Sequence, residues 1–239
     1  MSAGFEISEE TEAAHAAPNP EEVEPREAPR TGAEKFASEQ LLGLIRRLFL
    51  AAWPKPMRQI VFSGVGEDSG SAVLCARVAE ALSSQTTARV CLVETEQGIG
   101  EVEPGFGGAW ADDGNNPEAA GAVRASSLQI RKNLWLVPVR VWRSAEGSAT
   151  LPWMRRRLGK LRSEFDYAVI HAPPVGIGGE AETVARLTDG LVLVLQAHRT
   201  RRVLAQVTQQ RLRDANVEVL GAVLSDRRFP IPERLYRRF

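Results

Sequence analysis

Residues 58–83 read RQIVFSGVGEDSGSAVLCARVAEALS, a short apolar strand that runs into a glycine-rich turn and then into an apolar helix. This order is the outline of a phosphate-binding loop, in which a lysine and a serine or threonine follow the last glycine at the start of the helix. Gly70-Ser71-Ala72 stands at that point, so the lysine is missing. We therefore expect the strand, turn and helix of such a loop without its usual positive charge.

The composition limits the class of protein. Hydrophobic side chains make up 44% of the 239 residues, enough for one α/β domain with a sizeable core and a tail. Thirty basic residues balance thirty acidic ones, so we expect no nucleic-acid partner. Cys75 and Cys91 have no ligand-like spacing, and we expect them to be small buried side chains. The sequence shows no signal peptide and no apolar stretch of about 18 residues, which favours a cytoplasmic protein.

The sequence divides into three regions. Residues 1–35 are rich in Glu, Ala and Pro and predict a disordered tail. Residues 36–57 predict a linker and an amphipathic helix, which begins with Ser38 as its cap and ends at Trp53. We expect the apolar side of this helix to pack on the domain; a membrane surface or a partner protein is the alternative. Residues 58–239 form the domain itself.

Strands and helices alternate along the domain. After the helix that follows the glycine-rich turn, helical spacing predicts further helices at 151–165, 180–187 and 200–215. Apolar runs predict strands at 60–62, 89–93, 134–139, 167–170, 191–195 and 217–224. Glycines and turn residues predict a long loop over 97–131, and the Arg155–Arg157 run predicts a solvated helix face. The alternation favours a doubly wound, mostly parallel sheet in three α/β/α layers, with ligands at the carboxyl ends of the strands.

Four stretches line up in order with one known family. FDYAVIHAPPV at 165–175 resembles the FDYVIIDTPPV signature of the bacterial tyrosine kinases of capsule and exopolysaccharide synthesis, the CpsD/CapB group related to MinD and ParA. VCLVETE at 90–96 is similar to their VLLVDAD motif. ARLTDGLVLVLQAHRTRR at 185–202 resembles ARLADGVLLVVRAGKTRR, and VEVLGAVLSDRR at 217–228 resembles their closing VLGVVLN strand. The resemblance covers residues 58–228 and implies a P-loop NTPase-like fold of the MinD/ParA type.

The resemblance implies roles for the loop residues. In that family the loop amides hold the phosphates, the lysine neutralises them, and the hydroxyl residue helps to hold Mg²⁺. Aligned from the helix, Ser71 takes the lysine position and Ala72 the hydroxyl position; aligned from the strand, Gly70 and Ser71 take them. If the chain still binds nucleotide, the implied binding residues are Gly64, Gly66, Ser69, Gly70, Ser71 and Ala72.

The acidic positions of the family are also changed. Glu94 and Glu96 replace the two aspartates of the second motif, and His171 replaces the Walker B aspartate. A neutral imidazole has no charge to hold Mg²⁺, a cation that prefers oxygen ligands. We therefore assign no catalytic residue, expect no bound metal, and expect ATP and Mg²⁺ only if the altered site still works.

The family's substrate end is reduced as well. Those kinases phosphorylate a C-terminal cluster of tyrosines, whereas this chain ends IPERLYRRF with Tyr236 as the single candidate phosphosite. The family also tends to carry an E-x-x-R-x-x-R oligomerisation motif before the first strand, and this spacing is absent from the helix at 38–53.

Three functional hypotheses follow from these losses. The leading one is a kinase-like protein without catalysis that regulates or scaffolds exopolysaccharide or capsule synthesis. Its expected partner is the cytoplasmic part of a membrane polysaccharide co-polymerase or an active kinase paralogue. Through that partner it would lie at the inner face of the membrane. It would also form homo-oligomers. The first alternative is an ATP-binding tyrosine autokinase or ATPase with a non-standard site. The second is a ParA/MinD-like surface-positioning protein.

Overall fold

The computed structural model describes residues 32–51, 57–66, 69–96, 122–144, 147 and 149–226. Their helices and strands alternate in the order α1 (Gly32–Ile45), η1 (Arg46–Leu50), β1 (Gln59–Gly64), α2 (Ser71–Gln85), β2 (Val90–Glu94), η2 (Arg124–Ser126), β3 (Leu128–Arg131), β4 (Leu134–Val137), α5 (Val139–Trp142), α6 (Leu151–Glu164), β5 (Tyr167–Ala172), α7 (Glu180–Arg186), β6 (Gly190–Gln196), α8 (Arg202–Asp214) and β7 (Val219–Ser225).

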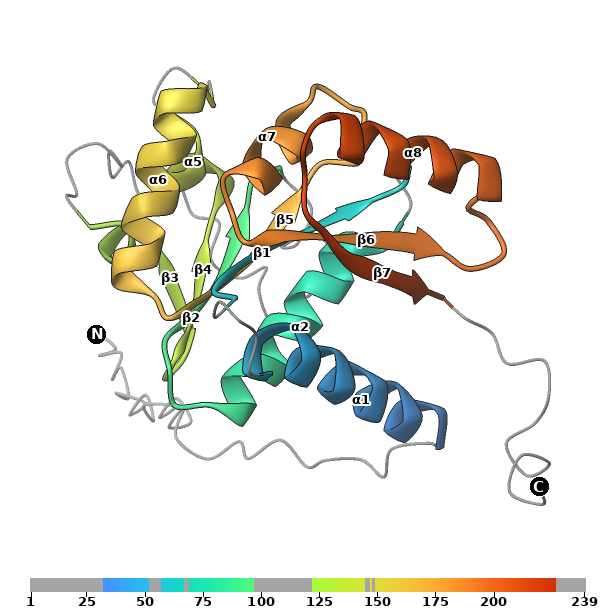
Figure 1. Ribbon diagram of the computed structural model, residues 1–239. Coiled ribbons are helices and arrows are strands. Elements are labelled where there is room, and N and C mark those ends of the chain that lie inside the picture. Colours follow the sequence, from blue (N-terminus) through green and yellow to red (C-terminus); the bar gives the residue numbers. More distant parts are fainter. Residues whose placement is uncertain are drawn as a thin grey trace, which may run out of the picture.

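The strands form one seven-stranded sheet in the order β3-β4-β2-β5-β1-β6-β7. Every neighbouring pair is parallel except β3 and β4, which are antiparallel. Helices α1 and α2 cover one face of this sheet, and α5, α6, α7 and α8 cover the other (Figure 1). The mostly parallel, three-layer α/β/α architecture predicted from the sequence is therefore confirmed.

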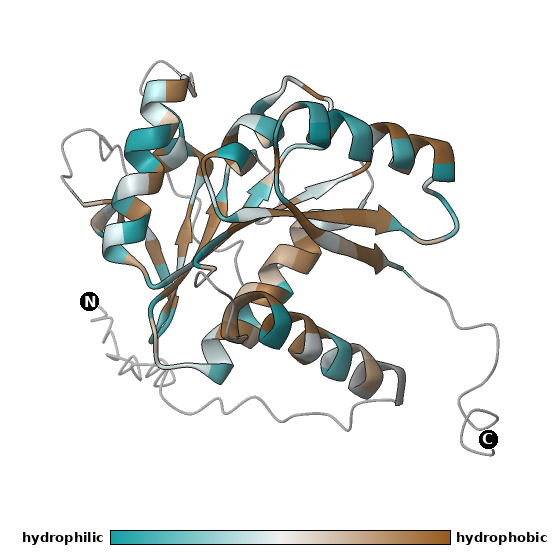
Figure 2. Cartoon of the chain, in the orientation of Figure 1, coloured by the Kyte–Doolittle hydropathy of each residue, from teal (hydrophilic) through white to brown (hydrophobic). Residues whose placement is uncertain are grey.

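Apolar side chains alternate between the two faces of each central strand. In β1, Ile60 and Phe62 join the core under α1 and α2, while Val61 joins the core under the other helices. All six residues of β1 are buried, as expected for a parallel strand covered on both sides. Apolar residues accordingly fill the strands, and polar residues lie mainly on the outer helix faces (Figure 2).

The first helix begins earlier than predicted. It starts at Gly32, so Ser38 lies inside it and does not cap it. The apolar side packs in the core, where Ile45, Leu48 and Phe49 are buried. The Phe49 ring packs edge-on against the Tyr167 ring, with 5.7 Å between the ring centroids. Packing on the domain is thus confirmed for this side of the helix. Within the described ranges, no helix is long and apolar enough to cross a bilayer.

Two further predictions were wrong in part. The loop predicted over 97–131 contains the strand β3, whose residues alternate between half-buried and exposed and pair with β4 through a tight turn. Residues 97–121 lie outside the described residues. Of the three arginines predicted to form a solvated face on α6, Arg157 is instead buried, with its guanidinium 4.4 Å from the centre of the Trp153 ring. A cation over an aromatic face is a favourable contact that offsets part of the cost of burying this guanidinium.

Candidate functional site

The carboxyl ends of three central strands meet at the start of α2. Strand β5 lies between β1 and β2, and the register places His171 beside Phe62 on one side and beside Glu94 on the other. Parallel strands that are covered by helices on both faces bring their carboxyl ends together at one edge of the sheet, where such folds bind their ligands. This edge is therefore the candidate functional site.

The turn between β1 and α2 is held from several sides. The amide of Val65 donates to the carbonyl of Val194 at 3.0 Å, and the amide of Val175 donates to the carbonyl of Gly64 at 3.1 Å. The hydroxyl of Ser225, at the end of β7, donates to the carbonyl of Ser69 at 2.7 Å. The described part of the turn is thus fixed to β6, to the segment after β5 and to β7.

Two glycines in this region are required by geometry. A Cβ on Gly64 would collide with the Oγ of Ser69 and lie 2.5 Å from its Cβ, so the buried Ser69 side chain fills the space above Gly64. Gly70 has a left-handed backbone with φ of 71° and directly precedes α2. A residue with a Cβ is strained in that conformation. Gly66 is also left-handed, with φ of 89°, and is exposed.

Ser71 and His171 form the central contact of the site. The Oγ of Ser71 lies 3.1 Å from the Nε2 of His171, and both side chains are buried. Burial lowers the pKa of His171 to about 4, because removing the ring from water disfavours its charged form. Near neutral pH the ring is therefore uncharged, with one nitrogen as donor and the other as acceptor. Its Nδ1 has no hydrogen-bond partner among the described residues.

The two glutamates of the second motif lie differently. Glu94 is fully buried at the end of β2, next to His171 in the sheet. Glu96 is exposed two residues later. Between them the amide of Thr95 donates to the carbonyl of His171 at 3.1 Å, which ties the two strand ends together. Glu94 is therefore the one carboxylate of this pair at the site, and Ala72, half-buried in α2, adds no oxygen ligand from its side chain.

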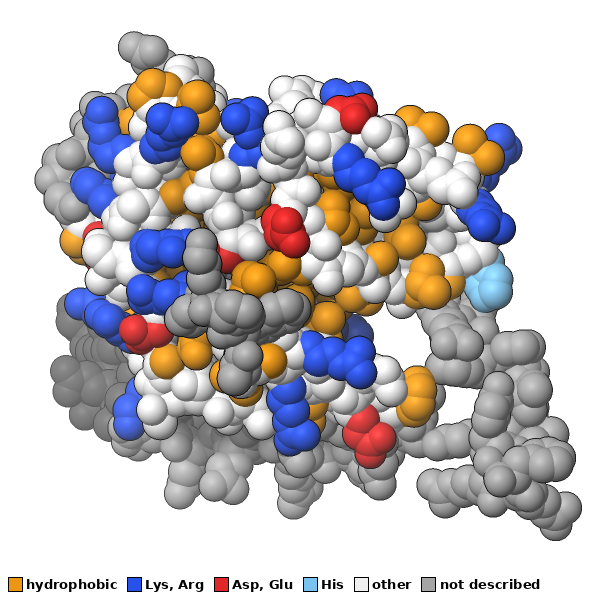
Figure 3. Space-filling model, viewed as in Figure 1, with side chains coloured by type: hydrophobic (Ala, Val, Ile, Leu, Met, Phe, Trp, Pro, Cys, Tyr) orange, Lys and Arg blue, Asp and Glu red, His pale blue; other side chains and the backbone are white. Residues whose placement is uncertain are grey.

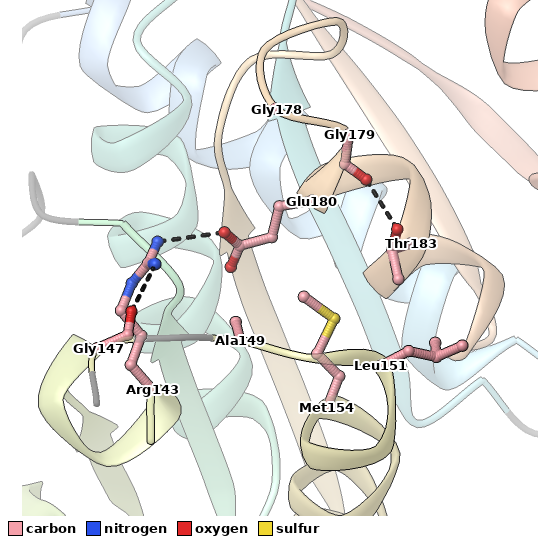
Figure 4. A pocket seen from close by; sticks show the side chains of 9 residues that line it. All are labelled: Arg143, Gly147, Ala149, Leu151, Met154, Gly178, Gly179, Glu180 and Thr183. Carbon is pink, nitrogen blue, oxygen red and sulfur yellow. Dashed lines mark hydrogen bonds and ion pairs between the residues drawn. The ribbon is translucent and has the colours of Figure 1, made fainter. Parts of the chain in front are cut away.

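A pocket of about 510 Å³ is lined by the first turns of α6 and α7 and by the segments that precede them (Figure 4). The sequence did not predict this pocket. Arg143 and Glu180 point toward one another across it, and the Nη2 of Arg143 lies 3.1 Å from the Oε2 of Glu180. Arg143 also donates to the carbonyls of Thr95 and Gly147, and Glu180 accepts a hydrogen bond from the Nε1 of Trp142. These charges satisfy one another, and no sequence motif marks them because they come from separate elements.

The two cysteines and the candidate phosphosite lie apart from these residues or outside the described part of the chain. Cys75 and Cys91 are buried free thiols, as predicted, and burial raises the pKa of both. Within the described ranges, no three His, Cys, Asp or Glu side chains are grouped as metal ligands. Tyr236, the predicted phosphosite, lies outside the described residues.

Comparison of the fold defines a class. The structure resembles MinD of Aquifex aeolicus with a TM-score of 0.56 and 14% identity, over 76% of this chain and 72% of that one. It resembles the kinase domain of the Escherichia coli tyrosine kinase ETK with a TM-score of 0.63 and 18% identity, over 82% and 79%. It resembles the VpsO kinase domain with a TM-score of 0.64 and 15% identity, over 82% of this chain and 98% of that domain. The fold is that of the MinD/ParA-like P-loop proteins, which includes bacterial tyrosine kinase domains.

Sequence comparison finds similarity to curated proteins named tyrosine-protein kinase CpsD. The chain is 29% identical to tyrosine-protein kinase CpsD of Streptococcus agalactiae over 73 residues. These matched residues make up 30% of this chain and 32% of the relative. The match thus spans about a third of the length of the curated relatives. No family model matches the chain. The resemblance to bacterial tyrosine kinases that the sequence motifs indicated is confirmed.

Proposed function

We propose that this chain is a tyrosine-kinase-like protein that does not transfer phosphate and instead regulates or scaffolds capsule or exopolysaccharide synthesis. The observation that carries the proposal is the buried contact of 3.1 Å between Ser71 and His171. In an active P-loop site the hydroxyl and the Walker B carboxylate act together on Mg²⁺. Here an uncharged ring stands at the Walker B position and binds the hydroxyl directly.

The loop geometry supports the loss of the lysine as well. The contact with His171 favours the alignment in which Ser71 is the hydroxyl residue, and this alignment gives the lysine position to Gly70. Gly70, however, has a left-handed φ of 71°, a conformation that a lysine adopts only with strain of about 1–2 kcal/mol. In that alignment a lysine at position 70 would be strained, whereas in the other alignment Gly70 is the last glycine of the loop and Ser71 takes the lysine position without such strain.

The side chains at the site also fit Mg²⁺ poorly. The described side-chain donors include the carboxylate of Glu94, the neutral ring of His171 and the hydroxyls of Ser69, Ser71 and Thr95. Mg²⁺ requires near-octahedral oxygen coordination and favours carboxylates and phosphates. One buried carboxylate next to a nitrogen donor is a weak basis for that geometry.

A regulator or scaffold needs a surface for its partner. The outer side of α8 exposes Val203, Leu204 and Val207, so apolar side chains are available outside the nucleotide site. Exposed apolar groups that cluster on one helix are a feature of partner-binding surfaces. We propose the cytoplasmic part of a membrane polysaccharide co-polymerase, or an active kinase paralogue in a mixed oligomer, as the partner. Copies of this chain would also form homo-oligomers.

Isothermal titration of the full chain with ATP or ADP and Mg²⁺ tests the loss of nucleotide handling. We expect no saturable heat, and an active kinase domain such as that of ETK measured alongside is the positive control. Micromolar binding that requires Mg²⁺ would overturn the loss of nucleotide binding, and transfer of labelled phosphate to protein would overturn the proposal as a whole. The variants Ser71→Lys/His171→Asp and Gly70→Lys/His171→Asp ask which alignment is correct, because binding should return in the one that restores the lysine at the right place.

Retained nucleotide binding is the second candidate function, and one feature of α2 favours it. This helix begins after Gly70 without a side-chain cap, and its first amides are therefore donors of the kind that hold anions at helix N-termini. Binding without phosphotransfer would make the chain a nucleotide sensor. The same titration distinguishes the two, because a sensor gives saturable binding heat. A separate assay with labelled ATP should then show no transfer of phosphate to protein.

A further inference from the structure

Strand β7 is an open edge of the sheet. It pairs with β6 and has no second strand beside it among the described residues. Its seven residues, VLGAVLS, include no charged side chain and no proline, the features that usually protect an edge from further pairing. Leu224 is 57% exposed on this strand. Figure 3 shows hydrophobic side chains along this side of the molecule.

A groove runs between this edge and α8. It has a volume of about 550 Å³. Leu193 and Leu195 of β6, with Val219 and Ala222 of β7, contribute its apolar lining, and Arg202 and Arg213 stand on the α8 side. Both arginines are exposed, and Glu218 is the single acidic residue of the lining. An extended segment with alternate apolar side chains and a carboxylate would satisfy the open edge, the apolar lining and the arginines together.

The N-terminal segment of the same chain has this composition. Residues 1–31, which lie outside the described residues, carry eight glutamates and two arginines, a formal charge of −6, and the remainder of the chain carries +6. Phe5 and Ile7 are two of the four large apolar residues in the segment, and they alternate with polar residues in GFEISEE at 4–10. In a strand, Phe5, Ile7 and Glu9 point to the same face because successive side chains alternate.

We propose that residues 4–10 add to β7 as an edge strand within the same molecule. Phe5 and Ile7 then cover the apolar lining of the groove, and Glu9 reaches an arginine of α8. The 24 residues between Ile7 and Gly32 can extend to roughly 80 Å, whereas a domain of this size has a radius of gyration of roughly 17 Å. The segment is therefore long enough to reach the edge. While it is bound, the edge is closed to strands of other proteins.

Hydrogen exchange of the β7 amides in the full chain tests the proposal. Phe5→Ser/Ile7→Ser should speed exchange in 219–225 by about tenfold or more, because the added strand no longer protects the edge. Val23→Ser, which changes an apolar residue outside the proposed strand, should leave exchange unchanged. Equal exchange in the Phe5→Ser/Ile7→Ser variant and the wild type would overturn the proposal. Protection that increases with protein concentration would also overturn it, because a second copy would then occupy the edge.

A charge exchange tests the contact with α8. Glu9→Arg should speed exchange, and combining it with either Arg202→Glu or Arg213→Glu should restore protection. The two arginines lie at opposite ends of α8, so the arginine that restores protection also gives the direction of the added strand. Restoration by neither would exclude the proposed pairing of Glu9.

Discussion

His171 couples the candidate site to folding through its proton. Because burial lowers its pKa to about 4, the unfolded chain binds a proton between about pH 6.5 and pH 4 that the folded chain does not bind. The stability that this ring contributes is complete above about pH 6.5 and is lost as the pH falls toward 4. The Ser71 hydroxyl beside it does not change that sign, since the ring interacts with it while uncharged.

We predict that His171→Asn removes this pH dependence. In the wild type the free energy of unfolding should fall by about 3 kcal/mol between pH 7 and pH 4 through this group, in addition to the effect of other groups. Urea unfolding across this range measures the difference in slope between the two proteins. His198→Asn, a change at an exposed histidine, is the matched control and should keep the wild-type slope. Parallel curves for wild type and His171→Asn would contradict the prediction.

Gly64 is the second residue with a direct test. Gly64→Ala should destabilise the protein by about 1–3 kcal/mol, because the new methyl group collides with the side chain of Ser69. Adding Ser69→Gly should recover part of this loss. The recovery is partial because the Gly66 carbonyl would still lie 3.0 Å from the new Cβ.

A control for Gly64 is available in α1. Gly43 has no atom within 4 Å of an added Cβ, so Gly43→Ala should stabilise the helix by about 0.5–1 kcal/mol. Thermal unfolding of the wild type, Gly64→Ala, Gly64→Ala/Ser69→Gly and Gly43→Ala measures whether each substitution stabilises or destabilises the protein. An unchanged stability of Gly64→Ala would show that the turn relaxes around the methyl group.

At the scale of elements, α8 contrasts with the other helices. Its outer side is apolar near its start, where Val203 is 69% exposed, while Leu212 on its inner side is fully buried. We predict that Val203→Ser/Val207→Ser changes the free energy of unfolding by less than about 0.5 kcal/mol per residue. Leu212→Ala should cost about 2–5 kcal/mol. Chemical denaturation compares them, and a large loss in the serine variant would mean that these valines are covered in the folded chain.

Secondary structure followed from periodicity wherever packing agreed with it. Continuous apolar runs such as 191–195 gave the central strands, because strands buried on both faces need apolar residues at every position. Strand β3 was missed because its four residues lie at the sheet edge and alternate only weakly within a polar region. The helix start at Ser38 was wrong because GAEKFA is itself compatible with a helix and extends α1 to Gly32.

The site was only partly readable from the sequence. The motifs placed Ser71, Glu94 and His171 at one sheet edge, because Glu94 and His171 lie at the carboxyl ends of parallel strands and Ser71 begins the helix that follows another. The sequence leaves the alignment of the turn ambiguous by one residue; the contact between Ser71 and His171 favours Ser71 as the hydroxyl residue, and the two lysine variants test this. The pocket around Arg143 was not predictable, since it depends on the meeting of elements that are separate in sequence.

At the scale of the whole molecule, the segment before β1 is part of the domain. Ile45, Leu48 and Phe49 are buried in the same core as the inner side of α2. Removing residues 1–31 should therefore lower the melting temperature by only a few degrees, the loss expected if the proposed edge strand on β7 is removed, whereas removing residues 1–50 should uncover this core and cause unfolding or aggregation. Differential scanning fluorimetry and size-exclusion chromatography measure both outcomes.

Single substitutions keep this prediction open to test even if the longer truncation does not fold. Phe49→Ala should cost about 3–5 kcal/mol, because the ring is buried and meets Tyr167 edge-on. Leu50→Ala, one residue further along, should cost much less because Leu50 is exposed. Equal losses from the two substitutions would mean that the helix is not docked as described. A membrane or partner contact through Phe49 would then become the better explanation of its apolar side.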